Sequence, residues 1–208
     1  MVASQCTRGL HCQRNETRFR PGTVVLDVGA NFGQMTVLFA RLVGPRGHVH
    51  SFEAEPFIGD VLNKNVEANL VREIVTIHRG VVWHTSGIDL IYPEPDLKKW
   101  PSFGSYGIVP SATEGRRIRS LTIDELNIKG PISFCKIDVQ GSDLFALYGA
   151  RRTIERERMP ILFEFETQCE DFGTAFSDYA DFVASIGYSF ASRIHLGQAN
   201  FLICPSRA

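Results

Sequence analysis

The residues best suited to chemistry lie in the turn DVGANFG at residues 27–33, which follows a short apolar run. Gly29 and Gly33 allow the backbone to approach a ligand closely, because a residue without a Cβ has neither side-chain bulk nor a restricted φ. The free amides at the start of the helix that follows can receive an anion such as a carboxylate. The turn therefore predicts a ligand site with an anion-binding corner.

The glycine spacing in this turn separates two classes of nucleotide site. A dinucleotide fingerprint requires G-x-G-x-x-G, but Asn31 stands where the middle glycine belongs, and Thr36 stands at the third glycine if Asn31 is skipped. Asp27 also places a carboxylate beside the turn, which would repel a pyrophosphate and can attract the ammonium of S-adenosylmethionine. Spacing and charge therefore favour S-adenosylmethionine, and an NAD-dependent oxidoreductase is the weaker alternative.

Acidic residues end three of the predicted strands. Glu53 closes the second strand, where a carboxylate can accept hydrogen bonds from both ribose hydroxyls of an adenosine, as it does in NAD enzymes. Asp138 ends the fourth strand, where it can accept a proton from a methyl acceptor or contact the cofactor amine. Glu166 shares a face of the fifth strand with Glu164 and lies nearer its carboxyl end, so Glu166 is the second candidate base.

Two histidines and a metal ion are further options for the chemistry. His84 and His195 lie in predicted loops and can also take up a proton. Asp138 with Glu164 or Glu166 could also be read as carboxylate ligands of a divalent ion. The sequence brings together no tight acidic cluster, so no metal is expected.

Alternating strands and helices position these residues. Apolar or β-like runs predict strands at residues 24–30, 48–53, 75–82, 134–139, 161–165, 188–194 and 200–204. Amphipathic helices are predicted after the first, second, fourth and fifth of these runs. The alternation implies an α/β fold with a mainly parallel sheet covered on both faces. The last two runs are too close for a helical crossover, so they should pair antiparallel.

The chain is expected to form one domain over residues 21–208, after an N-terminal tail at residues 1–20. Residues 83–120 break the alternation with prolines and glycines, and such an irregular insertion more often serves a site than a core. A plain surface hairpin is the alternative. The side chains that make the insertion a candidate acceptor-binding wall are Tyr92, Trp100, Phe103, Tyr106, Arg116, Arg117 and Arg119.

Composition and charge narrow the partners. The formal net charge is −1 and Lys and Arg are dispersed, so no footprint for nucleic acid or an anionic membrane stands out. A small-molecule acceptor fits better. No apolar stretch is long enough to span a bilayer, and the first residues lack the apolar core of a signal peptide. A cytoplasmic protein with reduced thiols is therefore expected, while the oligomeric state is not predicted.

Four ordered blocks together resemble the FkbM family of methyltransferases. They are DVGANFG at residues 27–33, FEAEP at 52–56, TIDEL at 122–126, and KIDVQG at 136–141 followed by Gly149 and Ala150. The resemblance implies a Rossmann-like class I methyltransferase fold with a seven-stranded sheet, and methyl transfer to a hydroxyl oxygen of a small molecule such as a sugar or polyketide. A non-catalytic methyltransferase-like binding domain is the alternative, disfavoured because the acids and glycines of the first two blocks are present.

The resemblance also implies roles for individual residues. The methionyl part of the cofactor would be held by Asp27, Gly29, Ala30, Asn31, Gly33 and Thr36. Glu53 would hold the ribose, with Ala54 next to it in place of the family's usual proline, and Gly80 and Val81 would lie near the adenine. Gln140 stands where the family often has Glu.

Overall fold

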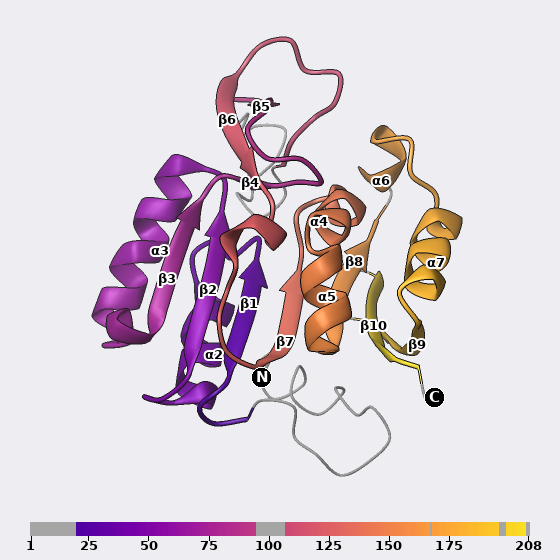
Figure 1. Ribbon diagram of the computed structural model, residues 1–208. Coiled ribbons are helices and arrows are strands. Elements are labelled where there is room, and N and C mark those ends of the chain that lie inside the picture. The colour runs from indigo at the N-terminus through magenta and orange to yellow at the C-terminus, as the bar shows by residue number, and fades with distance from the viewer. Residues whose placement is uncertain (1–19, 95–106, 167, 196–198, 207–208) are drawn as a thin grey trace.

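A seven-stranded sheet runs through the middle of the protein, as the computed structural model in Figure 1 shows. The structure describes residues 20–94, 107–166, 168–195 and 199–206. The strand order is β3-β2-β1-β7-β8-β10-β9. The strands are β1 (Val24–Val28), β2 (His48–Glu53), β3 (Val75–Arg79), β7 (Ile132–Ile137), β8 (Ile161–Phe165), β9 (Tyr188–His195) and β10 (Ala199–Pro205). The first five pair in parallel, and β10 is antiparallel to both β8 and β9. The expected mainly parallel seven-stranded sheet with an antiparallel C-terminal strand is confirmed.

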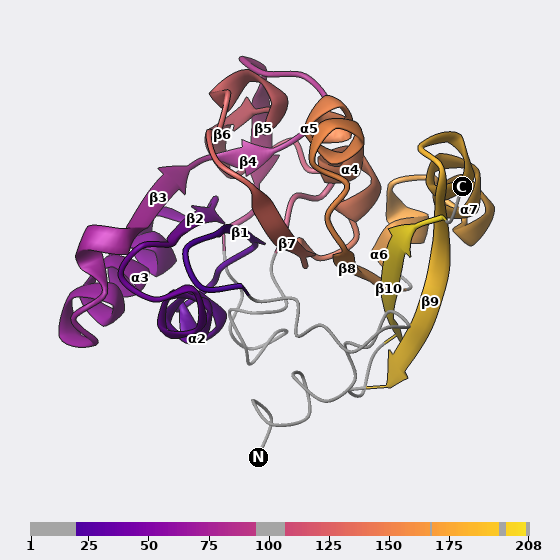
Figure 2. The ribbon, with the colours of Figure 1, turned by 60° about the horizontal axis from the view of Figure 1, so that its bottom comes forward.

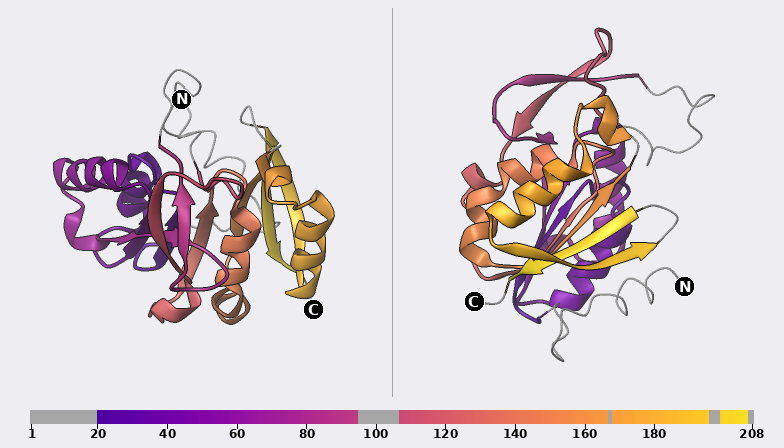
Figure 3. Two further views of the ribbon diagram at one scale, coloured as in Figure 1. Left: turned by 90° about the horizontal axis from the view of Figure 1, so that it is seen from above. Right: turned by 90° about the vertical axis from the view of Figure 1, so that its right-hand side faces the viewer.

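Helices cover both faces of this sheet, as the two views in Figure 3 show. They are α2 (Gln34–Val43), α3 (Pro56–Ala68), α4 (Asp143–Gly149), α5 (Arg151–Glu157), α6 (Gln168–Asp171) and α7 (Phe176–Ser185). Every residue of β1 is buried, because the side chains of a central strand alternate between two packed faces. Val25 belongs to the core with Phe39 of α2 and Leu62 of α3, whereas Leu26 belongs to the core with Leu147 of α4. Figure 2 shows α2 and α3 together on one side.

The third predicted strand is divided in the structure. Residues 75–82 were expected to form one strand, but β3 ends at Arg79, and Gly80 has a φ of +147°. The chain then continues as β4 (Val81–Val82), which pairs with β6 of a second, smaller sheet. The β-like pattern of the run cannot reveal this break, because each half of the run forms a strand, although in a different sheet. The single glycine is the local signal for it.

The insertion is more regular than expected. Its strands β5 (Asp89–Tyr92) and β6 (Arg116–Leu121) pair antiparallel, and the small sheet has the order β4-β6-β5. Tyr92, one of the candidate wall residues, is only 5% exposed and packs in a cluster with Trp83 and Ile118. Trp100, Phe103 and Tyr106 lie outside the described residues, as does the tail over residues 1–19. Figure 3 (right) shows the small sheet above the main one.

Two further expectations concern the C-terminal part and membranes. His195 was expected in a loop, which is wrong, because it is the last residue of β9. His84 does lie in a loop and is exposed. None of the helices in the described parts of the chain is long and apolar enough to cross a membrane.

Candidate active site

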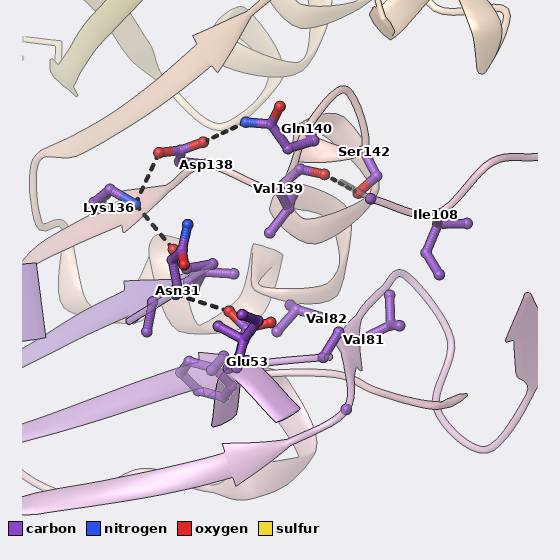
Figure 4. Close-up of a pocket in the computed structure, with 18 of the residues that line it drawn as sticks. Asn31, Glu53, Val81, Val82, Ile108, Lys136, Asp138, Val139, Gln140 and Ser142 are labelled. Atoms are coloured by element: carbon purple, nitrogen blue, oxygen red, sulfur yellow. Dashed lines mark hydrogen bonds and ion pairs between the residues drawn. The ribbon is translucent and has the colours of Figure 1, made fainter. Parts of the chain in front are cut away.

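A cavity of about 260 Å³ lies at the carboxyl ends of β1, β2 and β7, the edge at which open parallel sheets bind ligands. The insertion contributes part of the cavity wall through Tyr92 of the small sheet and through Gly107 and Ile108, which lie between β5 and β6. Figure 4 shows the polar side chains that point into it. The cavity is lined by Val28, Gly29, Ala30, Asn31, Phe32, Gln34, Met35, Phe52, Glu53, Ala54, Ile58, Gly80, Val81, Val82, Tyr92, Gly107, Ile108, Lys136, Asp138, Val139, Gln140 and Ser142.

The turn after β1 can only follow its path with glycine at position 29. Gly29 has a φ of +74°, in the left-handed region, and a Cβ there would lie 1.9 Å from the carbonyl oxygen of Asp138. The amides of Gly29 and Ala30 both donate to the carbonyl oxygen of Phe52, at 3.0 and 2.9 Å. The turn is therefore held tightly between the ends of β2 and β7, with its backbone forming the cavity floor.

The start of α2 supplies free hydrogen-bond donors to the cavity. The N-cap is Gly33, in a left-handed conformation, and no side chain caps the helix. The first helical hydrogen bond runs from the amide of Val37 to the carbonyl oxygen of Gly33, so the amides of Gln34 and Met35 have no partner inside the helix. Both residues line the cavity. Their amides and the positive end of the helix dipole suit a carboxylate.

Glu53 lies at the end of β2 with its carboxylate oriented by two backbone amides. Its Oε2 accepts a hydrogen bond of 2.8 Å from the amide of Asn31, and its Oε1 accepts one of 2.9 Å from the amide of Glu55. Each oxygen keeps a lone pair for a further donor, such as a ribose hydroxyl. Burial raises the pKa of Glu53, and the backbone hydrogen bonds oppose that rise.

Lys136 joins the turn after β1 to the end of β7. Its Nζ lies 3.1 Å from Oδ2 of Asp138, 3.7 Å from Oδ1 of Asp27 and 3.3 Å from the carbonyl oxygen of Gly29. Asp27 is fully buried, and its Oδ2 accepts a hydrogen bond of 2.6 Å from Thr36. Asp27 and Thr36 therefore lie beneath the turn and Gly33 lies behind it, and these three do not line the cavity.

The charge of Asp138 is maintained by Lys136. Burial by itself would raise the pKa of Asp138, but the Lys136 ammonium and the hydrogen bonds from Lys136 and Gln140 outweigh it and hold that pKa below its ordinary value. Burial lowers the pKa of Lys136, but Asp138 and Asp27 outweigh this and raise it. Both groups are therefore charged at neutral pH, and Asp138 presents a carboxylate to the cavity.

The acids of β8 lie apart from the cavity wall. Glu164 is 4% exposed, and burial together with Asp138 and Glu166 raises its pKa to about 10, so it is a neutral acid at pH 7. Glu166 follows β8 directly and does not line the cavity, and neither does His84. Within the described part of the chain, no three His, Cys, Asp or Glu side chains are grouped so that they could hold a metal ion. Asp138 is the best-placed candidate base.

Sequence analysis missed several wall residues. Lys136 had a signal, because it lies two residues before Asp138 in an otherwise apolar strand and must share its face. Gln140 was noted only as a departure from the family pattern, and Ser142 was not assigned to the site. Gly107 and Ile108 had no signal, since only the folding of the insertion brings them to the cavity.

The comparisons with known proteins decide the family. The sequence model described as "Methyltransferase FkbM domain" matches residues 27–190, most of the chain. The chain belongs to the FkbM methyltransferase family. A solved FkbM methyltransferase from Methylobacillus flagellatus has a TM-score of 0.61 and 17% identity, covering 88% of this chain and 48% of its own. Within this family the cofactor is S-adenosylmethionine.

Other similar proteins are methyltransferases of several kinds. An O-methyltransferase from Bacillus cereus, solved in complex with SAH, has a TM-score of 0.57 and 13% identity, covering 99% of this chain and 88% of that one. Fibrillarin from Aeropyrum pernix, solved with natively bound S-adenosyl-L-methionine, has a TM-score of 0.54 and 14% identity, covering 98% of this chain and 73% of that one. These likenesses show the class I methyltransferase fold.

Curated relatives match this FkbM methyltransferase over short stretches. A protein-L-isoaspartate O-methyltransferase of Aeropyrum pernix is 38% identical over 61 residues, which are 29% of this chain and 24% of that protein. A demethylmenaquinone methyltransferase of Symbiobacterium thermophilum is 30% identical over 79 residues, 38% of this chain and 30% of that protein. The matches span a third or less of those relatives, so they say nothing about the acceptor.

Proposed function

We propose that this FkbM methyltransferase transfers the methyl group of S-adenosylmethionine to a hydroxyl oxygen of a small molecule, such as a sugar or a polyketide. The observation that carries this proposal is Asp138, a carboxylate on the cavity wall whose charge Lys136 maintains. A hydroxyl acceptor must lose one proton during the transfer, and a carboxylate within reach can accept it. Glu166, beside the same sheet edge, is the second candidate base.

The described residues fit the cofactor. The amides at the start of α2 suit its carboxylate, while Gly29, Ala30 and Asn31 would flank its methionyl part from the turn. Glu53 has lone pairs free for the ribose hydroxyls, with Ala54 beside it. The adenine would then lie along Gly80 and Val81, which line the cavity beyond β3. Asp27, Gly33 and Thr36 would support this site from beneath the turn.

The chain's own groups account for the chemistry without a metal. When bound, the cofactor supplies an electrophilic methyl group on its sulfonium. Asp138 receives the acceptor's proton, and Lys136 keeps Asp138 ionised before transfer and orients it through the 3.1 Å contact. The close packing of Gly29 against the backbone of Asp138 fixes the distance between the turn and the end of β7 that carries this carboxylate, as alignment for an in-line displacement requires.

The insertion at residues 83–120 would form the acceptor-binding wall. Tyr92, Gly107 and Ile108 line the cavity from the described parts of this segment, which supports placing the acceptor against it. The net charge of −1 and the dispersed basic residues favour a small molecule over a nucleic acid.

A methyl-transfer assay tests the reaction type. The protein is incubated with cofactor labelled with ¹³C in its methyl group, and with panels of hydroxylated small molecules, peptides and structured RNA. We expect the label in an O-methyl group of a small molecule, identified by its carbon chemical shift. Transfer confined to RNA or to nitrogen would overturn the proposal, as would binding of NAD with no response to S-adenosylmethionine.

The ribose role of Glu53 gives a separate prediction. Glu53→Ala should weaken the binding of S-adenosylhomocysteine, the demethylated product, by about 1–3 kcal/mol, because buried hydroxyls are left without partners. Titration calorimetry measures this loss. Glu73→Ala is the matched control, since Glu73 is an exposed glutamate in the short turn just before β3. An unchanged dissociation constant in the Glu53 variant would show that the ribose lies elsewhere.

A further inference from the structure

An ion pair connects the insertion to the segment that follows Glu53. Arg116, the first residue of β6, donates from its NH1 group to Oε1 of Glu55. The Nε of Arg116 lies 3.2 Å from Oε1 of Glu94, which lies two residues after the end of β5. The side chain of Glu55 is 3% exposed, so Arg116 neutralises a carboxylate that is otherwise withdrawn from water.

Glu55 makes two further contacts that fix the chain around it. Its Oε2 accepts a hydrogen bond of 2.6 Å from the amide of Ile58 and thereby caps α3. Its own amide donates to Oε1 of Glu53 at 2.9 Å. Glu55 therefore links Arg116 and the start of α3 to the Glu53 carboxylate, because its amide is one of the two that orient that carboxylate.

We propose that Arg116 is a positioning residue for cofactor binding: through Glu55 it holds the Glu53 carboxylate in the orientation that receives the ribose. The inference rests on the proposed ribose role of Glu53. Arg116 itself does not line the cavity, so it acts through the Arg116–Glu55–Glu53 chain of contacts rather than by touching the cofactor.

The register of the hairpin extends this role to the cavity wall. Arg116 pairs with Tyr92 across β5 and β6, and Tyr92 lines the cavity. At its other end, β6 pairs with β4, where Ser120 lies opposite Val81 on the proposed adenine wall. The ion pair with Glu55 thus holds the start of β6, whose other end already pairs with β4 at the cavity wall. The same contact therefore positions both the insertion and the segment that orients the Glu53 carboxylate.

The experiment compares ligands that differ by one ribose hydroxyl. Affinities for S-adenosylhomocysteine and for its 2′-deoxyadenosyl analogue are measured by titration calorimetry for the wild type, Arg116→Gln, Arg116→Lys and Arg117→Gln. Arg117 is the matched control, because it is an exposed arginine on the opposite face of β6. The wild type and Arg117→Gln should prefer the hydroxylated ligand about tenfold or more. In Arg116→Gln this preference should fall below about threefold, with Arg116→Lys between the two.

The preference ratio distinguishes positioning from mere stabilisation of the fold, because a general weakening of the site lowers both affinities together. An Arg116→Gln protein that keeps the wild-type ratio would overturn the inference while leaving the role of Glu53 intact. A wild type that does not discriminate between the ligands would overturn the ribose placement and the inference with it. If Arg116→Gln does not fold, Arg116→Lys decides, since an unchanged ratio there contradicts a role that depends on the forked guanidinium.

Discussion

Asp138→Asn is expected to lower kcat by about 100-fold or more while S-adenosylhomocysteine binds within a few-fold of its wild-type affinity. An asparagine has nearly the same shape and keeps an oxygen that can accept from Gln140, but it cannot take up the acceptor's proton. General-base catalysis contributes about 10²–10⁴-fold to rates, so the loss should be of this order. Single-turnover measurements with the acceptor found in the screen would separate it from an effect on binding.

The matched control for this variant is Glu166→Gln, which neutralises the other candidate base outside the cavity lining. It should retain most of the wild-type kcat. The opposite order, with Glu166→Gln inactive and Asp138→Asn active, would transfer the role of base to Glu166.

The pH profile provides an independent check. Because the pKa of Asp138 is held below its ordinary value, the wild-type rate should show no acidic limb from this group between about pH 5 and pH 8. A rate that rises with pH toward a midpoint near 10 would point instead to Glu164, whose pKa is raised to about 10.

The parts of the fold that sequence analysis predicted correctly depend on short-range patterns. The range 161–165 matches β8 because it is a compact, mostly apolar run, and the range 48–53 matches β2, a β-like run that ends shortly before the proline at the start of α3. The glycine turn was found because a tight turn between a buried strand and a helix requires those residue types. Glu53 and Asp138 followed from the rule that parallel strands carry their ligands at the carboxyl ends.

What sequence analysis missed depends on contacts between distant segments. The strand expected at residues 75–82 is divided because its last residues find a partner in β6, about forty positions along the chain. The burial of Tyr92 was not predicted, because nothing nearby in sequence shows that it packs against Trp83 and Ile118. The contact of Lys136 with Asp27 was also missed, because a lysine in a strand reveals a partner on the neighbouring strand only when that strand is placed.

Gly29→Ala is expected to destabilise the fold strongly and to abolish cofactor binding in the folded fraction. Two effects add. The φ of +74° is unfavourable for alanine by about 1–2 kcal/mol. The new Cβ would also lie 1.9 Å from the carbonyl oxygen of Asp138, and its nearest neighbours are backbone atoms, which cannot rotate away. The turn and the end of β7 would have to separate.

Gly173→Ala isolates the first of these effects. Gly173 has a φ of +68°, close to that of Gly29, but a Cβ there would meet nothing within 4 Å. Its free energy of unfolding in urea should therefore fall by about 1–2 kcal/mol, the cost of the backbone conformation alone. The free energy of unfolding of Gly29→Ala should fall by about 1–3 kcal/mol more, the typical cost of overpacking against fixed atoms. Equal losses in the two variants would mean that β1 and β7 can move apart freely. In that case the close approach of the turn to Asp138 could not be what aligns the cofactor's methyl group with the carboxylate.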